Sequence, residues 1–228
     1  MDFSNQLIRC SALGKILTND RSGKQMGEAA KTFLKELYIE KVYGFKKDIT
    51  SKYITKGLLV EDTAISFYSV QKGDFYHKND EWFKNEFISG TPDILSGDTV
   101  VDIKSSWSAH SFFGVKGEPI KKDYYYQLMG YMALTGLKKA KLAYVLIDTP
   151  WQLVEDEKRR LSWQMGMVSE DSPEFMEALA EIERNHDFST IPDEKRIIEF
   201  DIEYDQKVVD DIYKRVEESR IYLNSLNG

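Results

Sequence analysis

The residues of this chain best suited to chemistry are two aspartates and a lysine near the middle of its 228 residues. Asp93 lies in the run Gly90–Leu95, Asp102 and Lys104 lie in the run Thr99–Lys104, and a Ser-Gly-Asp turn separates the two runs. Two β-rich runs around such turn residues predict a hairpin. Side chains alternate between the faces of a strand, so Asp102 and Lys104 emerge together. The pattern indicates a site for a hard cation with a lysine beside it.

A second interpretation of the same residues involves no chemistry. Asp102 and Lys104 could form an exposed ion pair on an edge strand, which would stabilise the fold by only about 0–1 kcal/mol. Pro92 lacks an amide hydrogen and is typical of an edge strand or a bulge. A buried charge needs a partner or a function, because an unpaired charge in an apolar core is costly. The two interpretations differ in whether this strand is exposed.

A predicted helix over residues 54–70 precedes the hairpin and carries a further carboxylate. Gly57 and Glu61 are one turn apart and share a face of this helix. Glycine inside a helix costs about 1 kcal/mol relative to alanine, so its presence suggests close approach by another element. If the hairpin packs over Gly57, Glu61 points toward the two aspartates. Glu61 could equally be a solvated glutamate.

A second predicted helix, over residues 122–134, follows the hairpin. Gln127 and Tyr131 are one turn apart on one face of it. The loop before this helix contains Trp107 and further aromatic residues. These aromatic side chains could stack on unpaired bases, or they could close the core over the end of the sheet.

The remaining elements predict an α/β fold with a central mixed sheet flanked by helices. Residues 141–147 form an apolar run typical of an interior strand, and residues 196–204 alternate as a half-buried strand does. The order helix, hairpin, helix, strand indicates an α/β core. Two helices between residues 151 and 191 are expected as a peripheral insertion. No Pro/Gly/Ser linker interrupts the chain, so residues 1–228 are expected to form one domain.

Composition restricts the classes of function. Hydrophobic residues make up 42% of the chain and charged residues 30%, as in ordinary soluble proteins. No apolar run could span a bilayer and no signal peptide is evident, so we expect a cytoplasmic protein with no membrane partner. The single cysteine, Cys10, excludes an internal disulfide and a cysteine-ligated zinc or iron–sulfur site. The net charge of −7 argues weakly against nucleic acid, but clusters such as Lys46-Lys47 are compatible with a local basic groove.

The N-terminal segment holds further candidates for binding phosphate. Ser11 is expected to cap a short helix over residues 11–17. Hydroxyls and helix N-termini are natural phosphate ligands, although a cap without a ligand would explain Ser11 equally well. Arg21 and Lys24 follow in a basic loop.

Four separated motifs occur in one order along the chain. They are Gly57-x-x-x-Glu61, Pro92-Asp93, Asp102-Ile103-Lys104 and Gln127-x-x-x-Tyr131. The ordered set resembles the PD-(D/E)XK nuclease superfamily, in the branch with a glutamine helix that includes RecB-type nucleases and lambda-type phage exonucleases. Ser11 and the basic loop extend the resemblance to the lambda exonuclease and YqaJ-like viral recombinase family. It covers most of residues 1–147 and, loosely, the final strand and helix, whereas residues 151–191 look unlike the compact family pattern.

The resemblance implies a PD-(D/E)XK restriction-endonuclease-like core and a metal-dependent site. One or two Mg²⁺ or Mn²⁺ ions would be held by Asp93, Asp102, the Ile103 carbonyl and, directly or through water, Glu61. Hard oxygen ligands suit these ions, and no iron–sulfur cluster is expected. Lys104 would orient or help activate the attacking water and stabilise developing charge. Gln127 would position Lys104 or the nucleophile.

The implied activity is exonucleolytic hydrolysis of linear duplex DNA, 5′ to 3′, in phage-type recombination, in the host-cell cytoplasm if a phage encodes the protein. Relatives act as ring-shaped homotrimers and work with a single-strand annealing protein. The residues implied in DNA binding are Ser11, Arg9, Arg21, Lys24, Tyr131 and Trp107. The family's arginine upstream of the serine is absent here, where Ser4 stands. The alternatives are a RecB-like single-strand nuclease, an endonuclease of the same superfamily, and a DNA-binding recombination accessory without activity.

Overall fold

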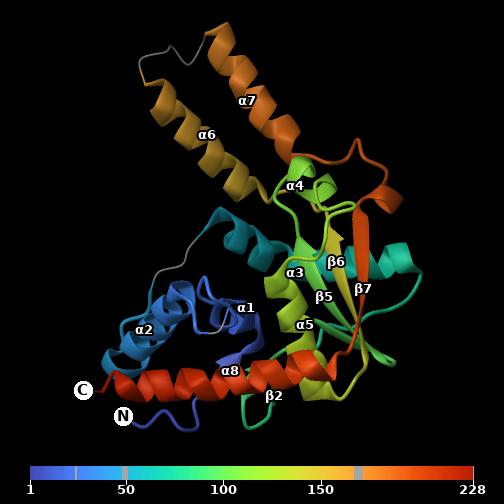
Figure 1. Cartoon of the computed structure of the whole chain (residues 1–228). Coiled ribbons are helices and arrows are strands. Elements are labelled where there is room, and N and C mark those ends of the chain that lie inside the picture. Colours follow the sequence, from blue (N-terminus) through green and yellow to red (C-terminus); the bar gives the residue numbers. More distant parts are fainter. Residues whose placement is uncertain (24, 48–50, 167–171, 228) are drawn as a thin grey trace.

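The computed structural model describes residues 1–23, 25–47, 51–166 and 172–227. Short N-terminal elements, including the first strand, are followed by two long helices and then by most of the strands. Two further helices, a last strand and a last helix complete the chain (Figure 1). In chain order the elements are β1 (Ile8–Arg9), the 3₁₀ helix η1 (Cys10–Ala12), α1 (Leu13–Ile16), α2 (Glu28–Tyr43), α3 (Lys52–Lys72), β2 (Phe83–Lys84), β3 (Ile88–Gly90), β4 (Ile94–Ser96), β5 (Thr99–Ser105), α4 (Ala109–Phe113), α5 (Lys122–Thr135), β6 (Lys139–Val145), α6 (Trp151–Met165), α7 (Pro173–His186), the 3₁₀ helix η2 (Asp193–Lys195), β7 (Ile197–Glu203) and α8 (Gln206–Ser225).

A four-stranded mixed sheet forms the centre of the molecule. Its strand order is β4-β5-β6-β7, with β5 and β6 parallel and the two outer pairs antiparallel. The predicted mixed α/β fold is therefore confirmed. A smaller sheet with the order β1-β3-β2 was not anticipated, because strands of two or three residues carry no readable alternation.

The central sheet is covered on both faces. On one face, side chains of β6 such as Leu142 pack with α5 and α8 in the larger hydrophobic cluster. On the other, Val101 and Ile103 of β5 pack with α3 through residues such as Val60 and Ile65. Fully burying one such aliphatic side chain contributes roughly 1.5–3 kcal/mol. The two clusters together hold β5 in place between α3 and α5.

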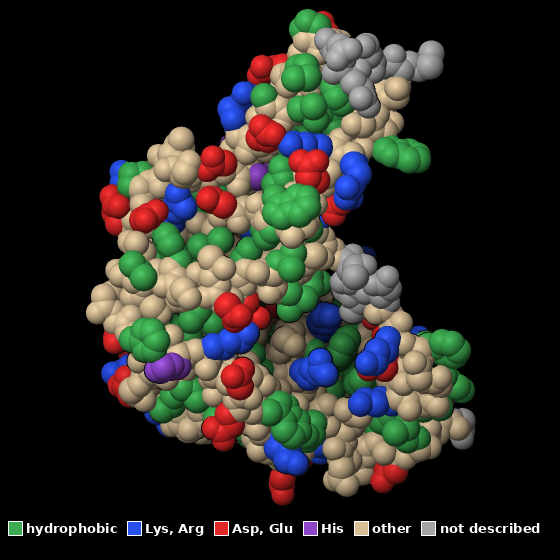
Figure 2. Space-filling model, turned by 180° about the vertical axis from the view of Figure 1, so that it is seen from behind, with side chains coloured by type: hydrophobic (Ala, Val, Ile, Leu, Met, Phe, Trp, Pro, Cys, Tyr) green, Lys and Arg blue, Asp and Glu red, His purple; other side chains and the backbone are tan. Residues whose placement is uncertain are grey.

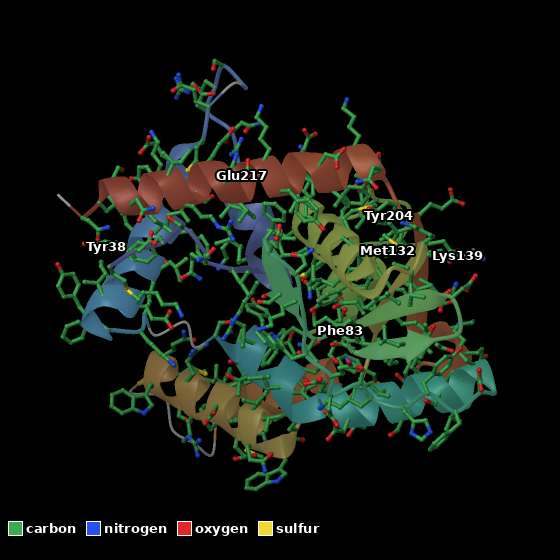
Figure 3. The ribbon with its side chains drawn as sticks, turned by 90° about the horizontal axis from the view of Figure 1, so that it is seen from below. Tyr38, Phe83, Met132, Lys139, Tyr204 and Glu217 are labelled. Atoms are coloured by element: carbon green, nitrogen blue, oxygen red, sulfur yellow. The ribbon has the colours of Figure 1, made fainter. Side chains whose placement is uncertain are left out.

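The C-terminal helix ties the N-terminal elements to the core. Seen from below, α8 runs across α2 and α5 (Figure 3). Tyr38 of α2 lies toward the C-terminal end of α8, and Tyr204 lies just before its N-terminal end. Asp205 caps α8, accepting hydrogen bonds from the amides of Lys207 and Val208. Arg215 of α8 donates hydrogen bonds to the carbonyls of Ile16, the last residue of α1, and Thr18, two residues after it. The two chain ends lie close together (Figure 1).

The helices α6 and α7 form a hairpin that projects away from the central sheet (Figure 1). The two helices expected between residues 151 and 191 are therefore present. Lys52 of α3 forms an ion pair with Glu157 of α6 at 3.0 Å, and Thr149 shares a 2.9 Å hydrogen bond with His186 at the end of α7. Within the part of the chain that the structure describes, no helix is long and apolar enough to cross a membrane.

Candidate active site

The predicted hairpin consists of β4 and β5. Ile94 pairs with Val101 and Ser96 with Thr99, and Gly97 closes the turn with a φ of 58°, a backbone conformation that suits glycine. β5 is an interior strand, since β6 pairs with its other edge. The side chain of Asp102 is 1% exposed. The interpretation of this strand as an exposed edge is therefore wrong.

A buried polar network surrounds Asp102. Its Oδ2 lies 2.7 Å from Lys104 Nζ in an ion pair, and its Oδ1 accepts a 3.1 Å hydrogen bond from Gln127 Nε2. The same amide nitrogen donates a 2.9 Å hydrogen bond to the hydroxyl of Tyr131. Gln127 and Tyr131 thus share a face of α5, as their spacing predicts, and that face points at β5.

Asp93 lies immediately before β4, in the segment between β3 and β4. The expectation that it would sit inside the strand is wrong, because Pro92 and Asp93 precede the first ladder pair, that of Ile94. Its Oδ2 accepts a 2.7 Å hydrogen bond from the amide of Ile103. The N–H and C=O of a strand residue point to the same side, so the Ile103 carbonyl lies at the edge of β5 that faces Asp93.

The neighbouring charges and burial shift the pKa values of Asp93 and Lys104. Burial, and then the charge of Asp102, raises the pKa of Asp93 from 3.8 to about 7, although Lys104 and the Ile103 amide oppose this rise. Burial pushes the pKa of Lys104 down, but the charges of Asp102 and Asp93 outweigh it and leave this pKa above its ordinary value. Lys104 is therefore a charged ammonium at neutral pH.

Glu61 lies on α3 near these groups without joining them directly. Its carboxylate is 3.3 Å from Lys78 Nζ, and its charge contributes to the raised pKa of Asp93. A Cβ added to Gly57 would meet no described atom within 4 Å. The expectation that another element approaches α3 closely at this glycine is therefore wrong. Glu61 faces the hairpin because Val60 and Ala64, its neighbours on α3, pack under β5.

The site has the donor set that a hard cation needs. Asp102 Oδ2 is a buried oxygen that accepts no well-formed hydrogen bond among the described residues, and Lys104 alone pairs with it. Asp93 is a second carboxylate whose pKa is raised by burial and then by the charge of Asp102, and a bound cation would oppose both effects. Among the residues the structure describes, no three acidic, histidine or cysteine side chains converge on one point. Asp93, Asp102 and a strand carbonyl are nevertheless hard oxygen donors of the kind that Mg²⁺ or Mn²⁺ binds.

Close packing behind the network was missed by sequence reasoning. A Cβ added to Gly90 would lie 2.6 Å from the Tyr131 ring, and one added to Gly130 would lie 2.8 Å from Cys10 Sγ. These glycines let η1 and β3 approach α5. A glycine inside a predicted helix, as at Gly130, was the sequence signal that could have indicated this close packing.

The residues expected to bind DNA are spread over several elements. Arg9 ends β1 and Ser11 lies in η1, both exposed, and η1 packs against α5. No side chain caps η1 or α1, so the expectation that Ser11 caps a helix is wrong. Arg21 is exposed in the following turn, and Lys24 lies outside the described residues.

Trp107 follows β5 and is engaged in packing. Its ring lies 4.9 Å from that of His186 in an edge-on contact, and Lys52 Nζ lies 4.7 Å from its centroid. Its carbonyl accepts a 3.3 Å hydrogen bond from Lys56, a lysine whose pKa burial lowers to about 8. These contacts join β5, α3 and α7, which favours the second of the two roles expected for this tryptophan.

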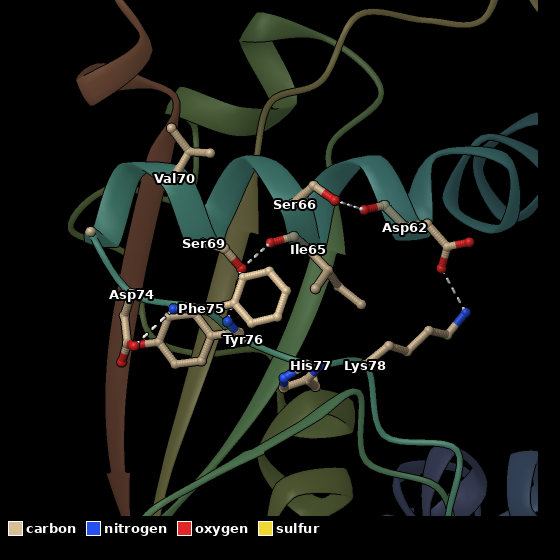
Figure 4. A pocket seen from close by; sticks show the side chains of 11 residues that line it. Asp62, Ile65, Ser66, Ser69, Val70, Asp74, Phe75, Tyr76, His77 and Lys78 are labelled. Carbon is tan, nitrogen blue, oxygen red and sulfur yellow. Dashed lines mark hydrogen bonds and ion pairs between the residues drawn. The ribbon is translucent and has the colours of Figure 1, made fainter.

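A pocket of about 680 Å³ opens along the C-terminal half of α3 (Figure 4). Asp62 and Lys78 on its wall form an ion pair at 2.9 Å. The hydroxyls of Ser66 and Ser69 donate to carbonyls of their own helix, so they are already satisfied. Neither aspartate of the hairpin region lines this pocket, which therefore adjoins the site and is not part of it.

The fold and the site together define a PD-(D/E)XK-like α/β protein, with Asp102 and Lys104 on its central hairpin and Asp93 immediately before it. No family model and no curated protein matches the chain. Among solved structures, a phage-related exonuclease from Haemophilus somnus 129PT matches with a TM-score of 0.76 and 27% identity, over 97% of this chain and 95% of that one.

The alkaline exonuclease LHK-Exo from Laribacter hongkongensis matches with a TM-score of 0.66 and 14% identity, over 97% of this chain and 90% of that one. LHK-Exo in complex with dAMP matches with a TM-score of 0.64 and 15% identity, over 98% and 90%. The chain thus has the fold of these lambda-exonuclease-like proteins over nearly its whole length. The resemblance predicted from the four motifs is confirmed at the level of the fold.

Proposed function

We propose that this chain is a metal-dependent exonuclease that hydrolyses phosphodiester bonds of linear duplex DNA. The observation that carries the proposal is the buried network of Asp102, Lys104 and Gln127 beside Asp93 on a strand of the central sheet. A protein that only binds DNA has no need for this costly group of buried charges. The full-length likeness to exonucleases supports the same conclusion.

Each residue of the network has a role in this proposal. Asp93, Asp102 and the Ile103 carbonyl would hold Mg²⁺ or Mn²⁺, as one or two ions, with Glu61 contributing directly or through water. Such an ion supplies a bound water of lowered pKa and offsets charge on the scissile phosphate. Lys104, charged at neutral pH, would orient the attacking water and stabilise the charge that develops on the phosphate oxygens. Gln127 would hold the carboxylate of Asp102 in place.

The electrostatics of the surface support a nucleic acid substrate. Figure 2 shows several Lys and Arg side chains close together on the lower half of the back face, below the projecting α6–α7 hairpin. A local group of cations can bind phosphates although the whole chain carries a charge of −7. LHK-Exo in complex with dAMP provides a precedent for a mononucleotide on this fold. By resemblance, Ser11 with Arg9 or Arg21 would receive the 5′-phosphate and Tyr131 would support the site.

The test compares linear duplex DNA, with and without a 5′-phosphate, with closed circular DNA in Mg²⁺ and in EDTA. We expect progressive loss of linear DNA, faster with the 5′-phosphate, and no cutting of circles. Cutting of circles would indicate an endonuclease, and degradation of single strands alone would indicate a RecB-like nuclease. Tight binding of DNA without hydrolysis in any divalent metal would indicate a DNA-binding accessory without nuclease activity.

The proposal extends to assembly. We propose a homotrimer that works with a single-strand annealing protein, because a ring would retain the duplex during successive cleavages. Sedimentation should give three times the monomer mass of 26.5 kDa. A strict monomer at working concentration would remove the ring and leave the chemistry of the site untouched.

A further inference from the structure

Beyond the residues of the four motifs, one side chain contacts the lysine of the site. The Nζ of Lys104 lies 5.2 Å from the centroid of the Tyr124 ring, within the range of a cation–π contact. We infer that Tyr124 is a positioning residue for Lys104. The inference concerns the same site and rests on the role proposed for Lys104 above.

The geometry of α5 explains why position 124 meets Lys104. α5 connects the parallel strands β5 and β6, so it runs antiparallel to β5. Gln127 contacts Asp102, and a residue one turn earlier on α5 meets the strand two residues later, at Lys104. Tyr124 and Gln127 are three residues apart and share the helix face that points at β5. The motif on α5 thereby extends to Tyr124-x-x-Gln127-x-x-x-Tyr131.

The ring of Tyr124 is itself held in place. It makes an edge-on contact with Tyr144, whose centroid is 6.2 Å away, and Tyr144 contacts Phe200 on β7 in the same manner at 6.0 Å. Tyr144 is the register partner of Lys104 on β6. A row of three rings across the sheet therefore fixes the side of Lys104 that Asp102 does not occupy.

A neutral ring can attract Lys104 equally strongly whether or not a cation is bound at Asp102. Asp102 attracts Lys104 most strongly when no cation shares its charge. The attraction between the ammonium and the Tyr124 ring is unaffected by a cation on the carboxylate. Tyr124 would therefore keep Lys104 at the reacting phosphate while Asp102 serves as a metal ligand.

The test replaces Tyr124 with Leu, which removes the ring, and with Phe, which keeps it. Tyr125→Leu is the matched control, because Tyr125 lies in the same helical turn and its ring contacts Tyr126. The direct readout is the NMR signal of the Lys104 ε-CH₂ protons in protein labelled with ¹³C-lysine, assigned by its loss in Lys104→Arg. A ring facing the ammonium moves this signal upfield.

We expect the signal to be upfield in the wild type, with and without Mg²⁺, to remain so in Tyr124→Phe and the control, and to lose the shift in Tyr124→Leu. In steady-state hydrolysis of linear duplex, Tyr124→Leu should lower kcat roughly 2- to 30-fold at unchanged KM, and Tyr124→Phe should restore it.

An unshifted Lys104 signal in the wild type overturns the inference, even if Tyr124→Leu does not fold. A Phe variant as impaired as the Leu variant also overturns it, because the hydroxyl and not the ring would then matter. If the wild type hydrolyses no DNA, the proposed function fails, while the NMR signal still decides whether Tyr124 positions Lys104.

Discussion

Replacing Asp93 with Asn should make the protein more stable and inactive at the same time. Asp93 is a buried carboxylate next to Asp102, and its pKa is raised to about 7. Asparagine has nearly the same shape and can still accept the hydrogen bond from the Ile103 amide. Asparagine removes a negative charge that lowers the stability of the fold and that would bind the metal ion.

The size of the effect follows from the pKa. A raised carboxylate pKa means that the folded state binds the proton more tightly than the unfolded state, so the wild type loses stability as the pH rises from about 4 to about 7. The rise in the pKa of Asp93 from 3.8 to about 7 corresponds to about 4 kcal/mol at pH 8 and roughly 2 kcal/mol at pH 5. Asp93→Asn avoids this loss, so its advantage should grow with pH and reach at most about 4 kcal/mol.

The assay is urea unfolding followed by tryptophan fluorescence in EDTA at pH 5 and pH 8. Asp98→Asn is the matched control, because Asp98 is an exposed carboxylate paired with Lys139 and its pKa is lowered. This control should leave stability unchanged or slightly reduced. Added Mg²⁺ should stabilise the wild type and the control but not Asp93→Asn, and so narrow the difference in stability between Asp93→Asn and the wild type. An Asp93→Asn variant that is less stable than the wild type at pH 8 in EDTA would refute the reasoning.

Three further outcomes are expected. Gln127→Leu removes the hydrogen bond to the buried Asp102 carboxylate, which should cost about 1.5–3 kcal/mol in urea unfolding and reduce kcat; unchanged values of both would contradict the network. Because a ligating carboxylate must be ionised, the Mg²⁺ affinity measured by calorimetry should fall by up to roughly tenfold per pH unit below pH 7, where Asp93 becomes protonated, and a pH-independent affinity would exclude Asp93 as a ligand. Lys78→Met frees the carboxylate of Glu61 from its ion pair and should raise the Mn²⁺ affinity, whereas a weaker affinity would mean that Lys78 holds Glu61 in place.

Much of the site could be predicted because its strand and helix patterns are regular. Alternation along β5 placed Asp102 and Lys104 on one face, and helical spacing placed Gln127 and Tyr131 together. Both relations depend only on local periodicity, and the structure contains both. The order of helix, hairpin, helix and strand likewise determined a mixed α/β fold.

The errors have a common physical cause, which is that tertiary packing decides what local pattern leaves open. Gly57 looked like a packing glycine, yet open space surrounds it, whereas Gly90 and Gly130 have close neighbours. Tyr124 stands in a run of three tyrosines, and only the packing of α5 against β5 decides which ring meets Lys104.

The most direct test of the proposed site is single-turnover hydrolysis of linear duplex DNA by Lys104→Ala in Mg²⁺. Lys139→Ala is the control, because Lys139 pairs with Asp98 on the exposed surface. We expect Lys104→Ala to hydrolyse at least roughly 100-fold more slowly, with DNA binding by fluorescence anisotropy nearly unchanged, and the control to match the wild type. Full turnover by Lys104→Ala would contradict the assignment of this site.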